Sequence, residues 1–127
     1  MDVINPASIC APAGLYSHGV VAPAGGRWLY VSGQIGMRPD GTMADGFEEQ
    51  ARIAWRNLMA VLSEAGMGIE HLVKVNSYLV EPSHLPLLGR VRAEFQPRPP
   101  PASTLVFVKA LVRPEWLYEV DAVAFHP

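Results

Sequence analysis

Two apolar segments near the end of the chain decide the fold: STLVFV at residues 103–108 and WLYEVDAVAF at residues 116–125. Their β-branched and aromatic residues are typical of strands, and Arg113-Pro114-Glu115 between them predicts a break. Glu119 and Asp121, two residues apart, are expected on one otherwise apolar face of the second strand. Two interpretations of this pair remain open: a solvated strip at a sheet edge, or a carboxylate held in a pocket for acid–base chemistry.

The first third of the chain predicts two shorter strands. Residues 16–21 and 28–35 have the apolar character of strands and lie between segments rich in proline and glycine. Gly25-Gly26 between them predicts a turn, so we expect the two strands to form a hairpin that ends before the turn at residues 39–41.

A long amphipathic helix is expected next. Asp45 has the character of an N-cap, and Glu48 three residues later would complete a capping box. Gly66 and Gly68 are expected to end the helix. The apolar positions recur at spacings of three and four, which predicts one buried stripe: Phe47, Ala51, Ala54, Leu58, Val61, Leu62 and Ala65.

The remaining elements complete an α+β pattern. Residues 71–80 predict a strand, with Val73, Val75, Ser77 and Leu79 on one face and Leu72, Lys74, Asn76, Tyr78 and Val80 on the other. Pro82 and Ser83 predict the start of a second helix with Leu85, Leu88, Val91 and Phe95 on its apolar side. This order of elements predicts one mixed β-sheet with both helices on one face, and another subunit is expected to cover the other face.

Composition excludes several classes of protein. The chain of 127 residues is interpreted as one domain, residues 1–127, and its hydrophobic content of 50% favours subunit contacts because no apolar run approaches the length of a membrane span. A formal net charge of -2 argues against a nucleic-acid partner. Arg90, Arg92 and Arg98 are interpreted as the solvated side of the second helix.

The chain carries no signal for secretion and no motif for a metal or cofactor. Its N-terminus lacks the pattern of a signal peptide and Cys10 is the single cysteine, which together predict a cytoplasmic location. The four histidines are far apart in the sequence, so no metal site is expected. Motifs for nucleotide binding and for α/β-hydrolase chemistry are absent from the sequence, and no cofactor is expected.

Four short stretches carry a family resemblance: AGLYSHG at residues 13–19, VSGQI at 31–35, a helix that begins QAR at 50–52, and YEVDAVA at 118–124. In this order they resemble the YjgF/RidA family, which has the motifs G-x-Y-S-x-G, S-G-Q, a Q-A-R helix and a closing E-x-E-A-like strand. The resemblance covers nearly the whole chain. It implies a chorismate-mutase-like α+β fold, assembly as a homotrimer, and one pocket at each subunit interface.

The resemblance also implies an activity and a set of site residues. Characterised family members hydrolyse reactive enamines and imines to a keto compound and ammonia. Glu119 matches the family glutamate that positions the attacking water, Tyr16 matches the site tyrosine, and Ser32 with Gly33 matches the pair that lines the pocket. Packing at an interface for Tyr16 and a backbone hydrogen bond for Ser32 remain alternatives.

The departures from the family pattern concern substrate binding. Ser103 stands where family deaminases carry an arginine that clamps the substrate carboxylate, Leu105 replaces a cysteine, and Leu88 replaces an asparagine. With Phe107 nearby, these residues predict an apolar pocket, and small 2-imino acids are not the expected substrates. Arg98 is the cation nearest in sequence that could replace the clamp.

The sequence leaves the roles of several charged residues open. Lys109 and Arg113 are further candidates for the missing charge, and His18 is either a proton shuttle or a residue of a surface loop. The role of Asp121 also stays open, with a structural or interface role favoured.

Two hypotheses about function follow. The first is a trimeric RidA-like enzyme that hydrolyses or otherwise processes a neutral or bulky imine, enamine or related unsaturated metabolite, with Glu119 as base. The second is a trimer that binds a small metabolite or a partner protein without turning it over. Ribonuclease activity, claimed for some relatives, is not supported by an acidic chain without a basic groove.

Overall fold

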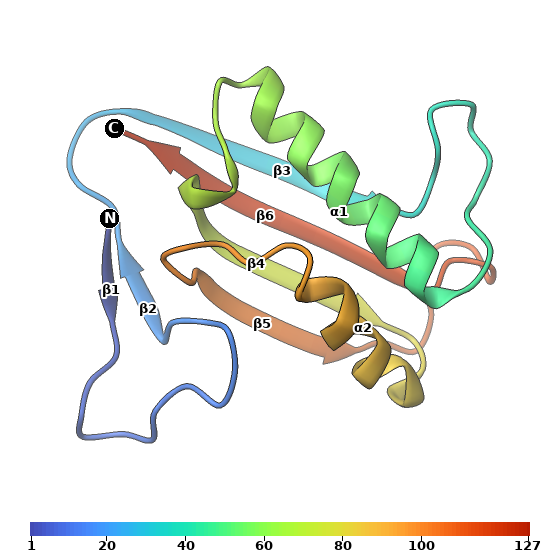
Figure 1. Ribbon diagram of the computed structural model, residues 1–127, viewed down its shortest axis with the longest axis horizontal. Coiled ribbons are helices and arrows are strands. Elements are labelled where there is room, and N and C mark those ends of the chain that lie inside the picture. Colours follow the sequence, from blue (N-terminus) through green and yellow to red (C-terminus); the bar gives the residue numbers. More distant parts are fainter.

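The computed structural model describes residues 1–127 and contains one four-stranded mixed sheet. In spatial order its strands are β3 (Arg27–Ile35), β6 (Tyr118–His126), β4 (Leu72–Leu79) and β5 (Ala102–Phe107). The last strand of the chain, β6, lies antiparallel between β3 and β4, while β5 runs parallel to β4 at the edge (Figure 1). The closing strand of the sequence is therefore a central strand of the fold.

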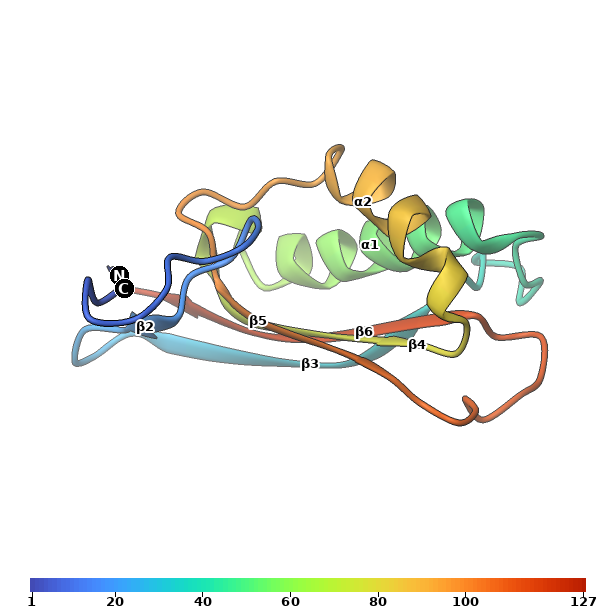
Figure 2. The same cartoon turned by 90° about the horizontal axis from the view of Figure 1, so that it is seen from below.

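Two α-helices cover one face of this sheet. They are α1 (Phe47–Glu64) and α2 (Leu85–Arg92), and short 3₁₀ turns, η1 (Ile69–His71) and η2 (Pro82–His84), precede β4 and α2. Figure 2 shows both helices on the same side of the sheet. The opposite side carries no helix and is the open face of the sheet. The predicted α+β arrangement with both helices on one face is confirmed.

The core lies between the helices and the sheet and contains a small polar network. Trp55 of α1 and Tyr118 of β6 are both fully buried. The indole Nε1 of Trp55 donates a hydrogen bond of 3.0 Å to the Tyr118 hydroxyl, which also lies 3.0 Å from the hydroxyl of Ser77 on β4. These bonds satisfy polar groups that would otherwise be costly to bury.

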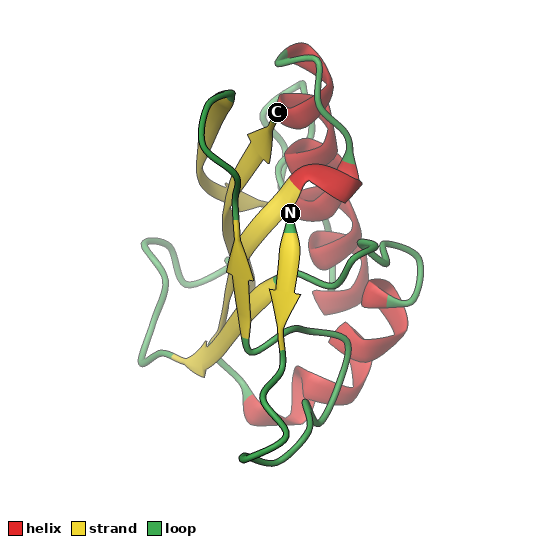
Figure 3. Cartoon of the chain, turned by 90° about the vertical axis from the view of Figure 1, so that its left-hand side faces the viewer, coloured by secondary structure: helices red, strands yellow, loops and turns green.

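The predicted hairpin between residues 16–21 and 28–35 is wrong. The short strand β2 (Gly19–Val21) pairs with β1 (Asp2–Ile4) in a separate two-stranded ribbon at the side of the molecule (Figure 3). Gly25 and Gly26 adopt φ angles of 79° and 106°, and this connection leads the chain to β3, which pairs with β6. The nine-residue strand β6 provides β3 with a much longer partner than the three-residue β2 would.

The predicted capping box of α1 is also wrong. The helix begins at Phe47 after Gly46, whose φ of 81° serves the turn, and no side chain caps the N-terminus. The C-terminal prediction is confirmed, because the helix ends at Glu64 and Gly66 follows with a φ of 71°. Left-handed φ values of this kind favour glycine at both positions.

One predicted face of β4 needs correction. Val75, Ser77 and Leu79 share one face as expected, and this face is buried under the helices. Leu72 is buried with them instead of lying on the opposite face. The register with β6 shifts between Leu72 and Lys74, and this irregularity moves Leu72 to the helix side.

Candidate functional site

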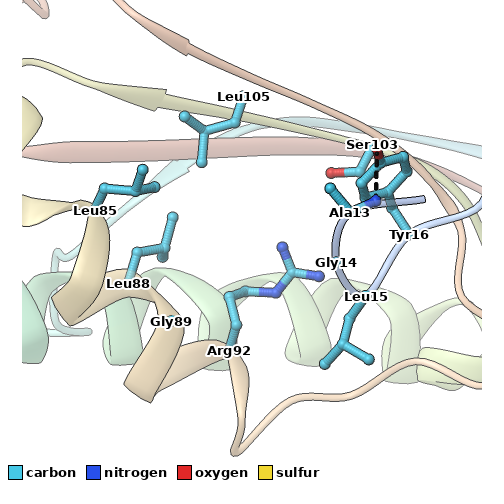
Figure 4. Close-up of a pocket in the computed structure, with 10 residues that line it drawn as sticks. All are labelled: Ala13, Gly14, Leu15, Tyr16, Leu85, Leu88, Gly89, Arg92, Ser103 and Leu105. Atoms are coloured by element: carbon cyan, nitrogen blue, oxygen red, sulfur yellow. Dashed lines mark hydrogen bonds between the residues drawn. The ribbon is translucent and has the colours of Figure 1, made fainter. Parts of the chain in front are cut away.

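A cavity of about 550 Å³ opens between α2, the edge strand β5 and the N-terminal loop that precedes β2. Figure 4 shows its three walls, with Arg92 reaching from α2 into the space between the helix and the loop. The residues that line it are Ala13, Gly14, Leu15, Tyr16, Leu85, Leu88, Gly89, Arg92, Ser103 and Leu105. The cavity is therefore mainly apolar, with an arginine and two hydroxyl groups in its walls.

The GLYSHG motif places its tyrosine in this cavity through the serine that follows. Ser17 is buried, its backbone N–H donates to the carbonyl of Pro101 over 2.8 Å, and its hydroxyl bonds the carbonyl of Pro100. These bonds tie the loop to the segment that leads into β5, so Tyr16 and Ser103 line the same cavity. The Tyr16 hydroxyl accepts a hydrogen bond of 3.2 Å from the N–H of Ala13, which leaves its own proton free to donate.

The interpretation of Arg92 as a solvated residue is wrong. Its neighbour Arg90 is 69% exposed and pairs with Glu48, whereas Arg92 follows Leu88 by four positions and points with it into the cavity (Figure 4). Residues four apart share a helix face, so the apolar stripe of α2 was a signal that could have identified Arg92.

The guanidinium of Arg92 is anchored to the core. Its Cζ lies 4.4 Å from the centre of the Trp55 ring, a cation–π contact, and its Nε is buried without a hydrogen-bond partner. Burial lowers the pKa of Arg92, because the charged form loses hydration. An arginine remains protonated despite this shift, so the cavity contains a positive charge.

Glu119 lies on the other side of the sheet. Its neighbours Tyr118 and Val120 are buried under the helices, and side chains alternate along a strand, so Glu119 and Asp121 project from the open face. The carboxylate of Asp121 is held there by a hydrogen bond of 2.8 Å from the Asn76 amide and one of 2.7 Å from the Tyr78 hydroxyl. Asp121 is thus part of a fixed polar network.

The surroundings of Glu119 favour its protonated form. Partial burial raises the pKa of Glu119 above its ordinary value, and the nearby charge of Asp121 raises it further. A Cβ added to Gly33 would collide with the Glu119 carboxylate, so the S-G-Q segment of β3 leaves space for that side chain. A carboxyl whose pKa moves toward neutrality is suited to exchange protons with a substrate.

The expected site residues therefore form two groups in one chain. The group that lines the cavity consists of Tyr16, Leu88, Ser103 and Leu105, together with the unexpected Arg92. The group at the open face consists of Glu119 with Gly33 of β3, where Ser32 precedes Gly33 at an irregularity in the pairing with β6. A sheet separates the two groups, so one chain does not bring its Tyr16 and Glu119 together.

The other candidates do not line the cavity. Phe107 follows Leu105 at the far end of β5 and is 45% exposed. Arg98 is exposed and donates to Gln96, and Lys109 and Arg113 are exposed as well. His18 is also exposed, with its Nε2 2.7 Å from the carbonyl of Cys10 and its ring edge-on to Tyr16.

Two further features bear on the type of site. No group of three or more histidine, cysteine or acidic side chains is arranged to hold a metal ion. No helix combines the length and apolar character that a membrane span needs.

Several known proteins are similar to this chain. The family model described as "Endoribonuclease L-PSP" matches residues 7–126. A "RutC family protein" of Synechocystis is 33% identical over 131 residues, which cover 100% of this chain and 98% of the relative. A "2-iminobutanoate/2-iminopropanoate deaminase" of Dermatophagoides farinae is 33% identical over 102 residues, which cover 79% of this chain and 77% of the relative.

A solved structure agrees with these relatives. The crystal structure of a Rid-family protein, YyfB from Yersinia pestis, superposes with a TM-score of 0.84 at 28% identity and covers 98% of both chains. The fold, the sequence relatives and the solved structure together define an α+β protein of the Rid class, to which imine deaminases belong. The chain belongs to the YjgF/RidA family, as its four motifs predict.

Proposed function

We propose that this protein hydrolyses a reactive imine or enamine at a site composed of two subunits. The cavity of one subunit binds the substrate, and Glu119 of the partner subunit activates the water. The observation that carries the proposal is the division of the site residues between two faces of the sheet, since each group lacks what the other contains. A ring of three copies, as the family resemblance implies, would bring the open face of one chain to the cavity of the next.

The reaction requires one carboxylate that transfers protons between the water and the substrate nitrogen. A water oxygen forms a bond to the carbon of the C=N group, and one water proton passes through the Glu119 carboxylate to the nitrogen, which gives a carbinolamine. The remaining hydroxyl proton then follows the same route to the nitrogen as the C–N bond breaks. The net reaction converts the imine and water to a carbonyl compound and ammonia. The raised pKa of Glu119 supports both transfers, because the carboxylate holds a proton more readily than an exposed glutamate does.

The substrate proposed here has a larger apolar part than a small 2-imino acid. Leu15, Leu85, Leu88 and Leu105 line the cavity, and Ser103 provides only a hydroxyl in the wall where the family pattern has an arginine. Four leucines in a cavity of about 550 Å³ favour a branched aliphatic or aromatic side chain on the imine carbon.

The test is the hydrolysis of imines that an amino-acid oxidase generates in the assay from amino acids with small and large apolar side chains. Glu119→Gln is expected to lower kcat/KM about 100-fold or more, because the amide cannot take the proton from water. Glu64→Gln removes an exposed carboxylate at the end of α1 and is the matched control, with unchanged activity expected. Equal turnover by wild type and Glu119→Gln would exclude the proposed role of Glu119.

The same chain has features of a protein that binds without turnover. Leu88 and Leu105 occupy positions where the family pattern has polar groups, and they favour retention of an apolar ligand. Incubation of the purified protein with metabolite extracts separates the two proposals, because a ligand recovered unchanged without ammonia release indicates binding alone.

A further inference from the structure

We propose that Arg92 gives the cavity its specificity by binding an anionic group of the ligand, a carboxylate in the case of a substrate derived from an amino acid. The positive charge then comes from helix α2 instead of strand β5, where Ser103 stands. This inference rests on the proposed function only in taking the cavity as the place where substrate binds. The ligand it predicts is amphipathic, with an anionic end at Arg92 and an apolar body against the leucines.

No acidic side chain of the chain forms an ion pair with Arg92. The pairs between arginines and carboxylates join Arg52 to Glu49 and Glu94, and Arg90 to Glu48. A charge removed from water without a partner is costly, and an anion that entered the cavity would offset this cost. Arg92 is thus an unpaired cation at a ligand-sized cavity.

Arg92 is held in place, and no hydrogen bond within the chain occupies its donors. The contact with the Trp55 ring uses the charge of the guanidinium and none of its N–H groups. Trp55 is itself fixed, because it is fully buried and bonded to the Tyr118 hydroxyl. The guanidinium therefore has a supported position, and its planar set of donors matches the two oxygens of a carboxylate.

The wall opposite Arg92 carries two hydroxyl groups. Ser103 and Tyr16 both line the cavity, and the Tyr16 hydroxyl keeps a proton to donate because it accepts from the N–H of Ala13. These hydroxyl groups are further donors for an anion in the cavity, while Leu15, Leu85, Leu88 and Leu105 offer only apolar contact. The lining thus combines donors for an anion with an apolar surface.

The test uses a carboxylic acid and its uncharged amide, 3-methylbutanoate and 3-methylbutanamide, titrated into the ¹⁵N-labelled full-length protein and followed by NMR. The wild type is expected to bind the acid more tightly than the amide. Arg92→Gln is expected to weaken binding of the acid about 10-fold or more, the loss of a charge-assisted pair, and to leave binding of the amide unchanged. Arg90→Gln on the exposed side of α2 removes the same charge and is the matched control, with no change expected.

A second variant protects the test against loss of folding. Arg92→Lys keeps the charge without the planar donors and is expected to bind the acid with intermediate affinity. Equal binding of acid and amide by the wild type would overturn the proposal. This result is expected if Arg92 instead pairs with Glu119 of the partner subunit. Failure of the acid to bind, or unchanged binding to Arg92→Gln, would overturn it as well.

The readout separates this inference from the proposed function. Binding is measured without turnover, so Arg92 can be shown to bind anions even if Glu119→Gln retains full activity. Conversely, hydrolysis that depends on Glu119 in a protein with no preference for the acid would retain the proposed function and exclude the role of Arg92.

Discussion

Two inactive variants of this protein are expected to restore activity when they assemble together. Glu119→Gln removes the proposed base at the open face, and Ser103→Trp fills the cavity on the helix side with an indole ring. The two changes lie in different halves of the proposed site. A mixed oligomer therefore contains interfaces at which the intact cavity of one variant meets the intact Glu119 of the other.

The size of the effect follows from counting these interfaces. In a random mixture of equal amounts, a given interface receives an intact cavity half of the time and an intact Glu119 half of the time, so about a quarter of the sites are wild type. If the ring is a trimer, every ring that contains both variants has about one intact site in three, whatever its composition. The activity of purified mixed rings thus also reports the number of subunits.

The assay requires two affinity tags and co-expression. Mixed rings are isolated by two successive purifications, and hydrolysis of the generated imines is compared with that of each variant alone and of the wild type. The matched control combines Ser103→Trp with Leu105→Trp. Both changes block the cavity half, so no interface in that mixture is intact and no activity should return.

Two outcomes would refute this reasoning. Absence of activity in mixed rings, with both variants folded and present, would mean that Glu119 and the cavity do not act in the same site. Recovery in the control mixture of two cavity variants would mean that the cavity is not required. Either result would remove the basis of a site composed of two subunits.

Two further predictions concern the polar networks. Asp121→Asn removes one charge that raises the pKa of Glu119; because the base acts when deprotonated and activity is lost as pH falls through that pKa, the acid limb of the kcat/KM profile should move to lower pH. A profile that is unchanged or moves to higher pH would contradict this. Tyr118→Phe removes the hydroxyl that bonds both the buried Ser77 hydroxyl and the Trp55 indole N–H, and it leaves both groups unpaired. The free energy of unfolding should fall by about 1–3 kcal/mol in urea titrations. The control Tyr30→Phe, at a side chain 74% exposed, should change it by less than about 0.5 kcal/mol. Equal effects of the two phenylalanines would show that the network adds no stability.

The sequence predicts those elements whose periodicity is strong and local. Helix α1 and the strands β3, β4, β5 and β6 lie close to the expected positions, because runs of alternating or helically spaced apolar residues record which face is buried. The common face of Glu119 and Asp121 follows from strand alternation alone. These features require no knowledge of which strands pair.

Features that depend on long-range pairing could not be predicted in this way. The hairpin prediction failed because β3 pairs with β6, which comes more than 80 residues later in the sequence. Placement of Glu119 and Ser103 on opposite faces depends on the registers of β4 with both β5 and β6, and sequence periodicity does not reveal register. Arg92 was missed because a charged residue was assigned to solvent although its helical position matched the apolar stripe.

The division of the site also accounts for where this chain departs from its family. The positions that differ from the family pattern, Ser103, Leu105 and Leu88, all line the cavity. Of the positions that agree, Glu119 and Gly33 lie together at the open face, and Tyr16 lines the cavity. The proposed change of substrate with an unchanged reaction fits the position of the differing residues, because in the proposed site the cavity selects the ligand and the Glu119 carboxylate transfers the proton. If Arg92 restores a positive charge from another wall of the cavity, the anionic end of the ligand is also retained, and the loss of the β5 arginine changes the orientation and bulk of the substrate without making it neutral.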